Sequence, residues 1–405
     1  MDEERRPCGR RFSFEGVVLT VKPKLAVAPP QTPGAPSFVE ATSRYEAWLG
    51  GQLTLVPPDL ALKHDRMAAS AFMFLRATFY RWMQLWPLVC PELADAKSVL
   101  AVGDLHTENF GTWRDVEGRL IWGCNDFDEA YELPYALDLV RLAASGLLGA
   151  EEGVIAIKPE EVCACILAGY RKGLKSGPRP YVLGEKYDWL RELALEDLRD
   201  PHHFAEKMRA LRKPAYPVSP KLKQAIVSLM PPDAERFSYR HRVAGLGSLG
   251  RPRVVALGSY YGSLVVREAK ALAPSAAYWA NGCEGTTRLL YDDIIDGAER
   301  CPDPFVKLKG RWIVRRLAAD ASSIDIDRLP KGKEKKLLTA MGRETANVHL
   351  GSASKSILKD LDARPDGWLE RAARAMVAAT LEDWQAWKAV HPGAPGAPKA
   401  APAKA

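Results

Sequence analysis

A short apolar run that ends at a glycine is the feature that most constrains the fold of this chain. Residues 98–102 read Ser-Val-Leu-Ala-Val and are followed by Gly103 and a polar loop. An apolar run of this length, bounded by a glycine, predicts a buried strand. Residues 111–113 and 119–122 predict two further strands, joined by the turn-forming residues 115–118. The sequence therefore places a polar loop between a buried strand and a β-hairpin.

The polar loop and the segment after the hairpin hold side chains that suit phosphoryl transfer. They are Asp104, His106 and Asn109 in the loop, and Asp126 and Asp128 after the hairpin. This chemistry needs a carboxylate that orients or deprotonates the attacking hydroxyl, and oxygen ligands for the Mg²⁺ that bridges the nucleotide phosphates. Asp104 suits the first role, and Asn109 and Asp126 suit the second. The pattern predicts a phosphotransferase that uses ATP and Mg²⁺ to modify the hydroxyl of a small molecule.

These two segments resemble the catalytic loop (H-G-D-x-H-x-x-N) and metal loop (I-D-x-x-D) of the aminoglycoside and choline phosphotransferases, a branch of the protein-kinase-like superfamily. The resemblance implies that Asp104 is the catalytic base and that His106 organises its loop. It implies that Asn109 and Asp126 bind the metal, with Asp128 as an accessory acid there. It also implies an α+β fold with two lobes, as in the aminoglycoside phosphotransferases. One position departs from the motif, because residue 102 is valine where that branch usually has histidine.

A longer series of motifs resembles domain-of-unknown-function family 2252. The motifs follow one another along the chain at residues 66–76, 103–111, 125–130, 134–145, 245–250 and 267–269. This resemblance implies a kinase-like fold and names no substrate.

A glycine-rich segment, residues 245–250, is the candidate nucleotide loop. A dinucleotide-binding loop of the Rossmann type would lie between a strand and a helix, with an acidic residue about 20 positions on. The residues downstream favour strands instead, which suits the kinase type of loop, in which a hairpin covers the phosphates. In ordinary kinases this loop precedes the catalytic aspartate, whereas here Gly245 follows Asp104 by 141 positions. Either the two lobes are permuted in sequence, or the glycines only make turns.

The cation that pairs with the phosphates has two candidates. The family usually has Lys-Glu-Ala where this chain has Arg267-Glu-Ala, and Lys270 follows three positions later. Arg267 can replace the lysine, because a guanidinium also binds phosphate, or Lys270 can reach the ligand. Strand alternation puts Val265 and Arg267 on one face, so a phosphate-facing Arg267 requires that face to look inward. The predicted nucleotide-binding residues are Gly245, Gly247, Ser248, Gly250, Arg267 and Lys270.

Length and composition predict several parts. The 405 residues exceed the ~250–300 at which single cores stop growing, and the hydrophobic fraction of 47% with a charged fraction of 26% is typical of a globular chain. The expected parts are an N-terminal arm with a proline-rich linker (1–40), a mainly helical lobe with the catalytic and metal loops (41–240), a β-rich nucleotide-covering lobe (241–320), C-terminal helices (321–390) and a disordered tail (391–405).

Several helices are expected from apolar periodicity and from their first and last residues. They cover residues 66–88, 134–148, most of 160–240, 333–362 and 366–390. Asp138 and Arg141 lie three positions apart in the second of these helices and are expected to form a structural ion pair. No catalytic role is assigned to His349.

Charge and cysteine usage indicate the compartment and the partners. The net charge of +7 suits anionic ligands such as nucleotides, but the basic residues are scattered, so no nucleic-acid partner is predicted. The seven cysteines show no C-x-x-C pair, which predicts a reduced, cytoplasmic environment. No stretch reaches the ~18 apolar residues that a membrane span needs, and the first residues show no signal-peptide core.

Two other functions stay open. Asp104-Leu-His106 also fits the D-x-H opening of metal-dependent phosphoesterases of the calcineurin type. That fold needs further Gly-Asp and Gly-Asn-His elements, which this sequence does not contain. A pseudokinase that binds nucleotide without turnover is the third reading, because arginine replaces the usual lysine at position 267.

Overall fold

The computed structural model describes residues 34–184, 186–196, 200–321, 326, 329 and 332–392, with the backbone alone at 195–196 and 352–354. The description below concerns the unit that spans residues 32–405. Most of the arm and linker expected at 1–40 and of the tail expected at 391–405 lies outside the described residues.

Four helices and a single 3-10 turn open the described chain. They are α1 (Phe38–Gln52), α2 (Pro57–Ala69), α3 (Ala71–Ala77), α4 (Phe79–Val89) and the turn at Pro91–Leu93. The single helix expected over 66–88 is therefore wrong, because the chain breaks at Ser70 and Thr78. Ser70 is extended, and its hydroxyl accepts a hydrogen bond from the backbone N–H of Met73, which caps the start of α3.

Two small antiparallel sheets carry the polar loop. Strand β1 (Ser98–Ala101) pairs with β4 (Tyr131–Pro134), and β2 (Phe110–Arg114) pairs with β3 (Leu120–Cys124), which pairs in turn with β5 (Tyr181–Val182). The hairpin turn is held by Asp115, whose Oδ1 accepts from the backbone N–H groups of Glu117 and Arg119. The polar loop thus leaves β1 and returns as β2, as the sequence predicts.

Helix α5 (Tyr135–Glu151) is the central helix of the fold. Every residue from Tyr135 to Gly149 is buried, as expected of a helix that is apolar on most of its surface. It packs against α6 (Pro159–Ser176), α12 (Glu334–Ala363) and α13 (Trp368–Val390). Glycines allow α6 and α12 to approach closely, since a Cβ on Gly169 would collide with the backbone of Thr339.

A buried ion pair connects α13, the last helix, to α4. The guanidinium of Arg81 in α4 donates to both carboxylate oxygens of Asp383 in α13, through Nε at 2.7 Å and Nη2 at 3.0 Å. The two residues are 302 positions apart in sequence. Helix α13 also contacts α1, α2 and α3.

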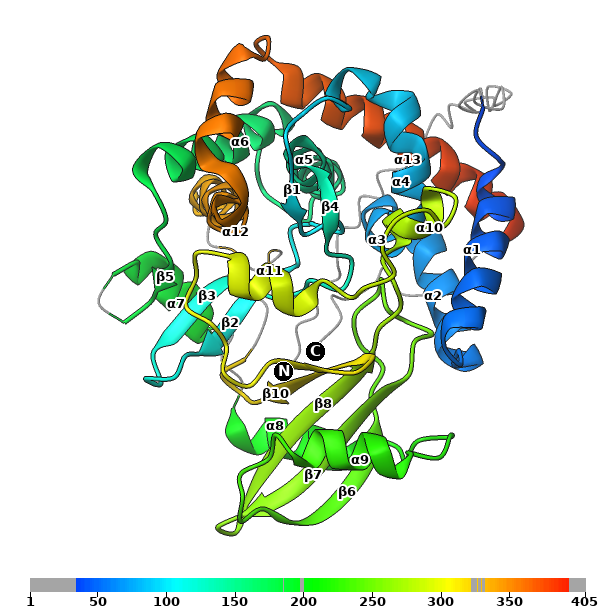
Figure 1. The fold of residues 1–405 in the computed structure, drawn as a ribbon, viewed down its shortest axis with the longest axis vertical. Coiled ribbons are helices and arrows are strands. Elements are labelled where there is room, and N and C mark those ends of the chain that lie inside the picture. Colours follow the sequence, from blue (N-terminus) through cyan, green and yellow to red (C-terminus); the bar gives the residue numbers. More distant parts are fainter. Residues whose placement is uncertain are drawn as a thin grey trace, which may run out of the picture. The chain divides into compact units, whose positions relative to one another are not determined.

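A five-stranded antiparallel sheet forms the other layer, with the strand order β6-β7-β8-β10-β9. The strands are β6 (Glu235–His241), β7 (Arg253–Tyr260), β8 (Ser263–Ala271), β9 (Lys307–Lys309) and β10 (Trp312–Leu317). Helix α9 (Pro220–Val227) packs its Leu222 and Ile226 on one face of this sheet, and α8 (Pro201–Ala210) packs its Met208 on the other. Figure 1 shows this sheet apart from the α5, α6, α12 and α13 layer, with β2, β3 and α11 between them.

The remaining helices are short: α7 (Asp188–Glu196), α10 (Ala276–Ala280) and α11 (Tyr291–Gly297). The fold is therefore a mixed α+β arrangement with several small sheets. Residues 242–252, at the start of the lobe expected to be β-rich, form the loop between β6 and β7, where Gly245 and Gly250 have positive φ angles of 69° and 92°. None of the described helices combines the length and apolar character needed to cross a membrane.

Candidate functional site

A cavity of about 1250 Å³ brings most of the predicted site residues together. It is larger than the ~300–1,000 Å³ usual for small-molecule sites. Its lining includes Asp104, His106, Asn109, Asp126, Asp128, Gly245, Gly247 and Ser248. Residues from three distant parts of the chain therefore meet in one space.

Asp138 of α5 fixes the start of the polar loop. Its carboxylate accepts hydrogen bonds from the backbone N–H of Val102 at 2.7 Å and of Gly103 at 2.9 Å. Nε2 of His349 lies 3.0 Å from the same carboxylate, and Nδ1 of His349 faces the hydroxyl of Tyr170 at 2.9 Å. These side chains are fully buried, so His349 supports the loop from behind and is not among the residues that line the cavity.

Arg141 binds Asp104, so the ion pair expected between Asp138 and Arg141 is wrong. Nε and Nη2 of Arg141 both donate to Oδ1 of Asp104, at 2.8 and 2.5 Å. The guanidinium lies over the ring of Trp82 and also donates to the carbonyl of Leu75. Burial raises the pKa of Asp104, and the charge of Arg141 opposes that shift. Arg141 therefore holds one oxygen of Asp104 in place.

His106 and Asn109 bond to each other within the loop. The backbone N–H of His106 donates to Oδ1 of Asn109 at 2.6 Å, and the N–H of Glu108 donates to Nδ1 of His106 at 3.2 Å. Burial, together with the charges of Arg76 and Arg141, lowers the pKa of His106 well below its usual range. The imidazole is therefore neutral, which suits its acceptor role.

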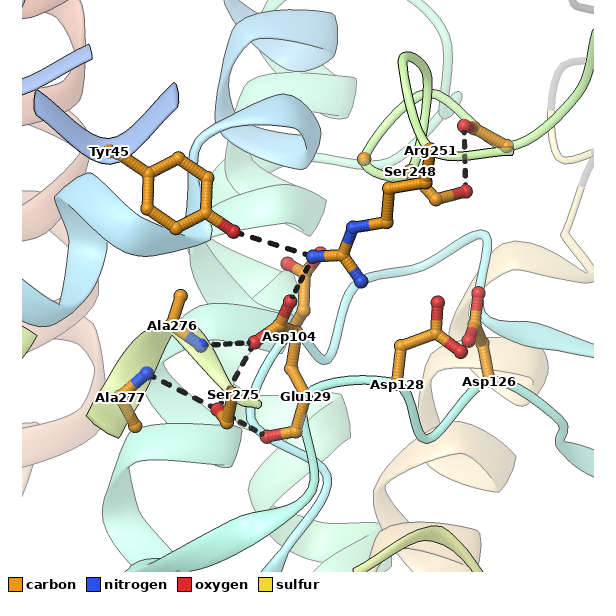
Figure 2. A network of polar contacts seen from close by, with 12 residues as sticks. Tyr45, Asp104, Asp126, Asp128, Glu129, Ser248, Arg251, Ser275, Ala276 and Ala277 are labelled. Carbon is orange, nitrogen blue, oxygen red and sulfur yellow. Dashed lines mark hydrogen bonds and ion pairs between the residues drawn. The ribbon is translucent and has the colours of Figure 1, made fainter. Parts of the chain in front are cut away.

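Lys270 joins the two aspartates that follow the hairpin. Its Nζ lies 3.2 Å from Oδ1 of Asp126 and 2.5 Å from Oδ2 of Asp128. Burial acts to raise the pKa of Asp126, but the charges of Lys270 and Arg315 outweigh it and hold that pKa well below its usual range. Burial and the charge of Asp126 raise the pKa of Asp128 to about 6. The two carboxylates lie side by side in Figure 2.

The glycine segment lies against Asp104. A Cβ on Gly247 would be 3.3 Å from Oδ2 of Asp104 and 3.0 Å from the carbonyl of Arg76. The ammonium of Lys63 in α2 donates to the carbonyl of Gly247 at 3.1 Å. The segment therefore approaches Oδ2 of Asp104 through a residue at which any side chain would be tightly packed.

Three of the predicted nucleotide-binding residues, Gly250, Arg267 and Lys270, are not among those that line the cavity. Gly250 contacts α2, where its carbonyl accepts from the backbone N–H of Val56 at 2.8 Å. Arg267 lies on the α9 face of the sheet, where its Nε donates to the carbonyl of Leu229. The apolar residues Val265 and Ala269 share that face and pack on α9, which turns Arg267 away from the cavity and leaves Lys270 on the inner face.

Several charged residues of the site were not foreseen from the sequence. Arg251 bridges Glu129 at 2.8 Å and the hydroxyl of Tyr45 at 3.3 Å (Figure 2). Arg242, Arg253 and Arg315 surround Glu268. Their positions in the sequence carry no signal, because their partners lie on separate strands and loops.

Residues 55–227 match DUF2252, described as an uncharacterized protein conserved in bacteria. This match supports the family that the motifs resemble. The matched span contains the polar loop, the hairpin, Asp126 and Asp128, and it ends before the glycine segment and Lys270. No curated protein and no solved structure matches the chain.

Proposed function

We propose that the protein is a phosphotransferase that uses Mg²⁺ and ATP to phosphorylate a hydroxyl group of a small molecule. The observation that carries this proposal is the convergence of Asp104, Asp126 and Gly247 on one cavity. Phosphoryl transfer depends mainly on positioning and on charge, so a base, a metal site and a phosphate-covering loop must share one space.

The order of the strands supports a kinase-like arrangement with permuted lobes. In protein kinases a glycine-rich loop covers the phosphates, and a lysine on the third strand of the sheet pairs with them. Here the glycine segment joins the first two strands of the sheet, β6 and β7, and Lys270 lies on the third, β8. The sheet follows the catalytic loop in sequence, whereas in ordinary kinases it precedes that loop.

The acids after the hairpin fit a magnesium ion. Asp126 and Asp128 carry two negative charges against the single charge of Lys270, and Oδ1 of Asp128 is buried without a hydrogen-bond partner among the described residues. In the described part of the chain no three acidic, histidine or cysteine side chains gather as ligands. Mg²⁺ is usually held by one or two carboxylates, waters and the substrate phosphates, so a pair is sufficient.

Asn109 is the weaker of the proposed ligands. Its Oδ1 already accepts from the backbone N–H of His106, so binding a metal through that oxygen would require sharing it. When bound, Mg²⁺ would neutralise part of the charge on the phosphates. The residues that would hold it are Asp126 and Asp128, with Asn109 beside them.

Asp104 is the proposed base. Its Oδ2 is turned toward the cavity side, and a raised pKa makes its carboxylate a better proton acceptor. The acceptor hydroxyl would give its proton to Oδ2 as its oxygen bonds to the γ-phosphorus. The bond from that phosphorus to the leaving ADP oxygen would break in the same step.

The position of Gly247 favours a second candidate, a nucleotide-binding protein without turnover. Gly247 lies against Oδ2 of Asp104, although Asp104 itself lines the cavity, so the glycine segment limits how a hydroxyl can approach that oxygen. If the segment blocks that approach, the site binds nucleotide and leaves Asp104 unused.

Thermal-shift titration followed by a turnover assay tests the proposal. A ligand at 100 times its Kd stabilises the folded state by about 2.7 kcal/mol, so Mg-ATP should raise the Tm, and adenosine should not. The Asp126→Ala variant should lose this shift, whereas Asp296→Ala, an exposed carboxylate of α11, should keep it. Absence of any shift with Mg-ATP would reject both candidates, and a shift without turnover would favour the second.

A further inference from the structure

The inner face of the five-stranded sheet carries more positive charge than its acid can balance. Glu268 of β8 is fully buried and accepts from three guanidiniums, those of Arg242 at 2.6 Å, Arg253 at 2.7 Å and Arg315 at 3.0 Å. Burial alone would raise the pKa of Glu268, but the three arginines hold it well below its usual range. One negative charge therefore stands among three positive charges.

The arginines are held in fixed orientations. Arg315 lies directly opposite Glu268 in the β8–β10 ladder, Arg253 comes from β7, and Arg242 follows the end of β6. A guanidinium has five N–H donors, so a single carboxylate cannot occupy all the donors of three of them. Glu268 orients the guanidiniums and leaves donor capacity for a ligand.

Two of the three arginines face the cavity. Arg242 and Arg315 belong to its lining, and their side chains are 11% and 27% exposed, compared with 4% for Arg253. The charge of Arg315 also contributes to the lowered pKa of Asp126. The positive cluster is therefore adjacent to the acids that would hold the metal.

The positive charge of Lys270 is already compensated by the two carboxylates of Asp126 and Asp128, so it contributes little to binding a phosphate. The acidic pair with Lys270 has one negative charge in excess, and the cluster of Arg242, Arg253 and Arg315 with Glu268 has two positive charges in excess. The cavity thus has one end that favours a cation and a neighbouring end that favours an anion. A chain of phosphates with its metal ion complements both ends.

We propose that Arg242 and Arg315, oriented by Glu268, form an anion site that binds a chain of two or more phosphates without a metal ion. Arg253 and Glu268 are positioning residues behind it. The inference rests on the proposed function only for the identity of the ligand as a nucleotide. The group that the site recognises is the phosphate chain, which either a nucleotide or an inorganic polyphosphate can supply.

Calorimetric titration in the presence of EDTA tests this site with three probes: tripolyphosphate, ATP and adenosine. We expect the first two to bind and adenosine to bind more weakly. Arg242→Gln and Arg315→Gln should each weaken tripolyphosphate binding roughly 10- to 100-fold, the usual value of a charge-assisted contact. Arg267→Gln is the matched control, because it makes the same change on the opposite face of the same sheet, and it should change the affinity less than threefold.

The outcomes separate this inference from the proposed function. If ATP binds and both Gln variants keep full affinity for tripolyphosphate, the anion site is rejected while a nucleotide site survives. If tripolyphosphate binds as tightly as ATP and no turnover occurs, the anion site stands and the phosphotransferase proposal fails. Thermal unfolding checks that each variant folds. Arg242→Lys and Arg315→Lys, which keep the charge, should retain more affinity than the Gln variants, and equal losses would contradict the inference.

Discussion

The guanidinium of Arg141 donates two hydrogen bonds to a single oxygen of Asp104, Oδ1. Arg141 is fully buried, so its positive charge acts on Asp104 with little screening by water. The pairing both positions the carboxylate and favours its ionised form.

The first prediction concerns this pair. Arg141→Met should raise the pKa of Asp104, because burial already raises it and the opposing positive charge is lost. A base must be ionised to act, so the rising limb of the pH–rate profile should move to higher pH, while nucleotide affinity stays nearly unchanged. Arg141→Lys should move the limb back toward the wild-type position. A variant with lower turnover at every pH and an unmoved limb would indicate a structural role only.

The second prediction separates the two aspartates by role. Asp126→Ala should abolish Mg²⁺-dependent nucleotide binding, because removing a hard oxygen ligand leaves the phosphate charge uncompensated. Asp104→Asn should leave nucleotide affinity nearly unchanged while turnover falls about 10²–10⁴-fold, since its contact forms mainly in the transition state. Calorimetry and an ATP-hydrolysis assay measure the two effects. Equal loss of binding in both variants would contradict this division.

The third prediction concerns Gly247. An alanine there would bring a methyl group to 3.0 Å from the carbonyl of Arg76 and to 3.3 Å from Oδ2 of Asp104. Gly247→Ala should therefore push the segment off Asp104 and change turnover at least tenfold, with a Tm loss of a few degrees. Gly51→Ala in α1 is the control, because no atom lies within 4 Å of the added Cβ, and it should leave turnover unchanged. Wild-type turnover in Gly247→Ala would remove the segment from the mechanism.

The fourth prediction is a pH dependence from Asp128. Its pKa is about 6 in the folded protein and about 3.9 in an unfolded chain, so between these pH values the folded state binds more protons. The contribution of Asp128 to the free energy of unfolding should therefore fall as the pH rises from 4 to 6, by at most about 3 kcal/mol. The Asp128→Asn variant should lack this pH-dependent contribution to the free energy of unfolding. Denaturant unfolding of both proteins at pH 4.5, 6 and 7.5 measures it, and parallel pH profiles would exclude the assignment.

The polar loop and the hairpin could be predicted because their signals are local. A glycine after a short apolar run and a turn sequence between two strands determine the backbone there. That backbone in turn places Asp104 and Asn109 in the loop and Asp126 directly after the hairpin. Ser70 is a local signal that apolar periodicity does not detect. Its hydroxyl caps the start of α3 and so ends the preceding helix within an otherwise helical pattern. Reading that serine as a start signal would have divided the helix expected over 66–88.

Partners distant in sequence could not be predicted in this way. Asp138 and Arg141 are close enough on one helix to pair, yet each binds a group at least 35 positions away. The choice between Arg267 and Lys270 depended on which face of β8 looks inward. Strand alternation leaves that choice open, and the packing of α9 on Val265 and Ala269 decides it.

The ion pair between Arg81 and Asp383 has a consequence for biosynthesis. A ribosome adds about 5–20 residues per second, so Arg81 emerges roughly 15–60 seconds before the carboxylate that neutralises it, 302 positions later. During that time the surfaces of α1 to α4 that α13 will cover stay exposed. The nascent protein therefore cannot complete its helical layer until translation is nearly finished, although the polar loop was made long before.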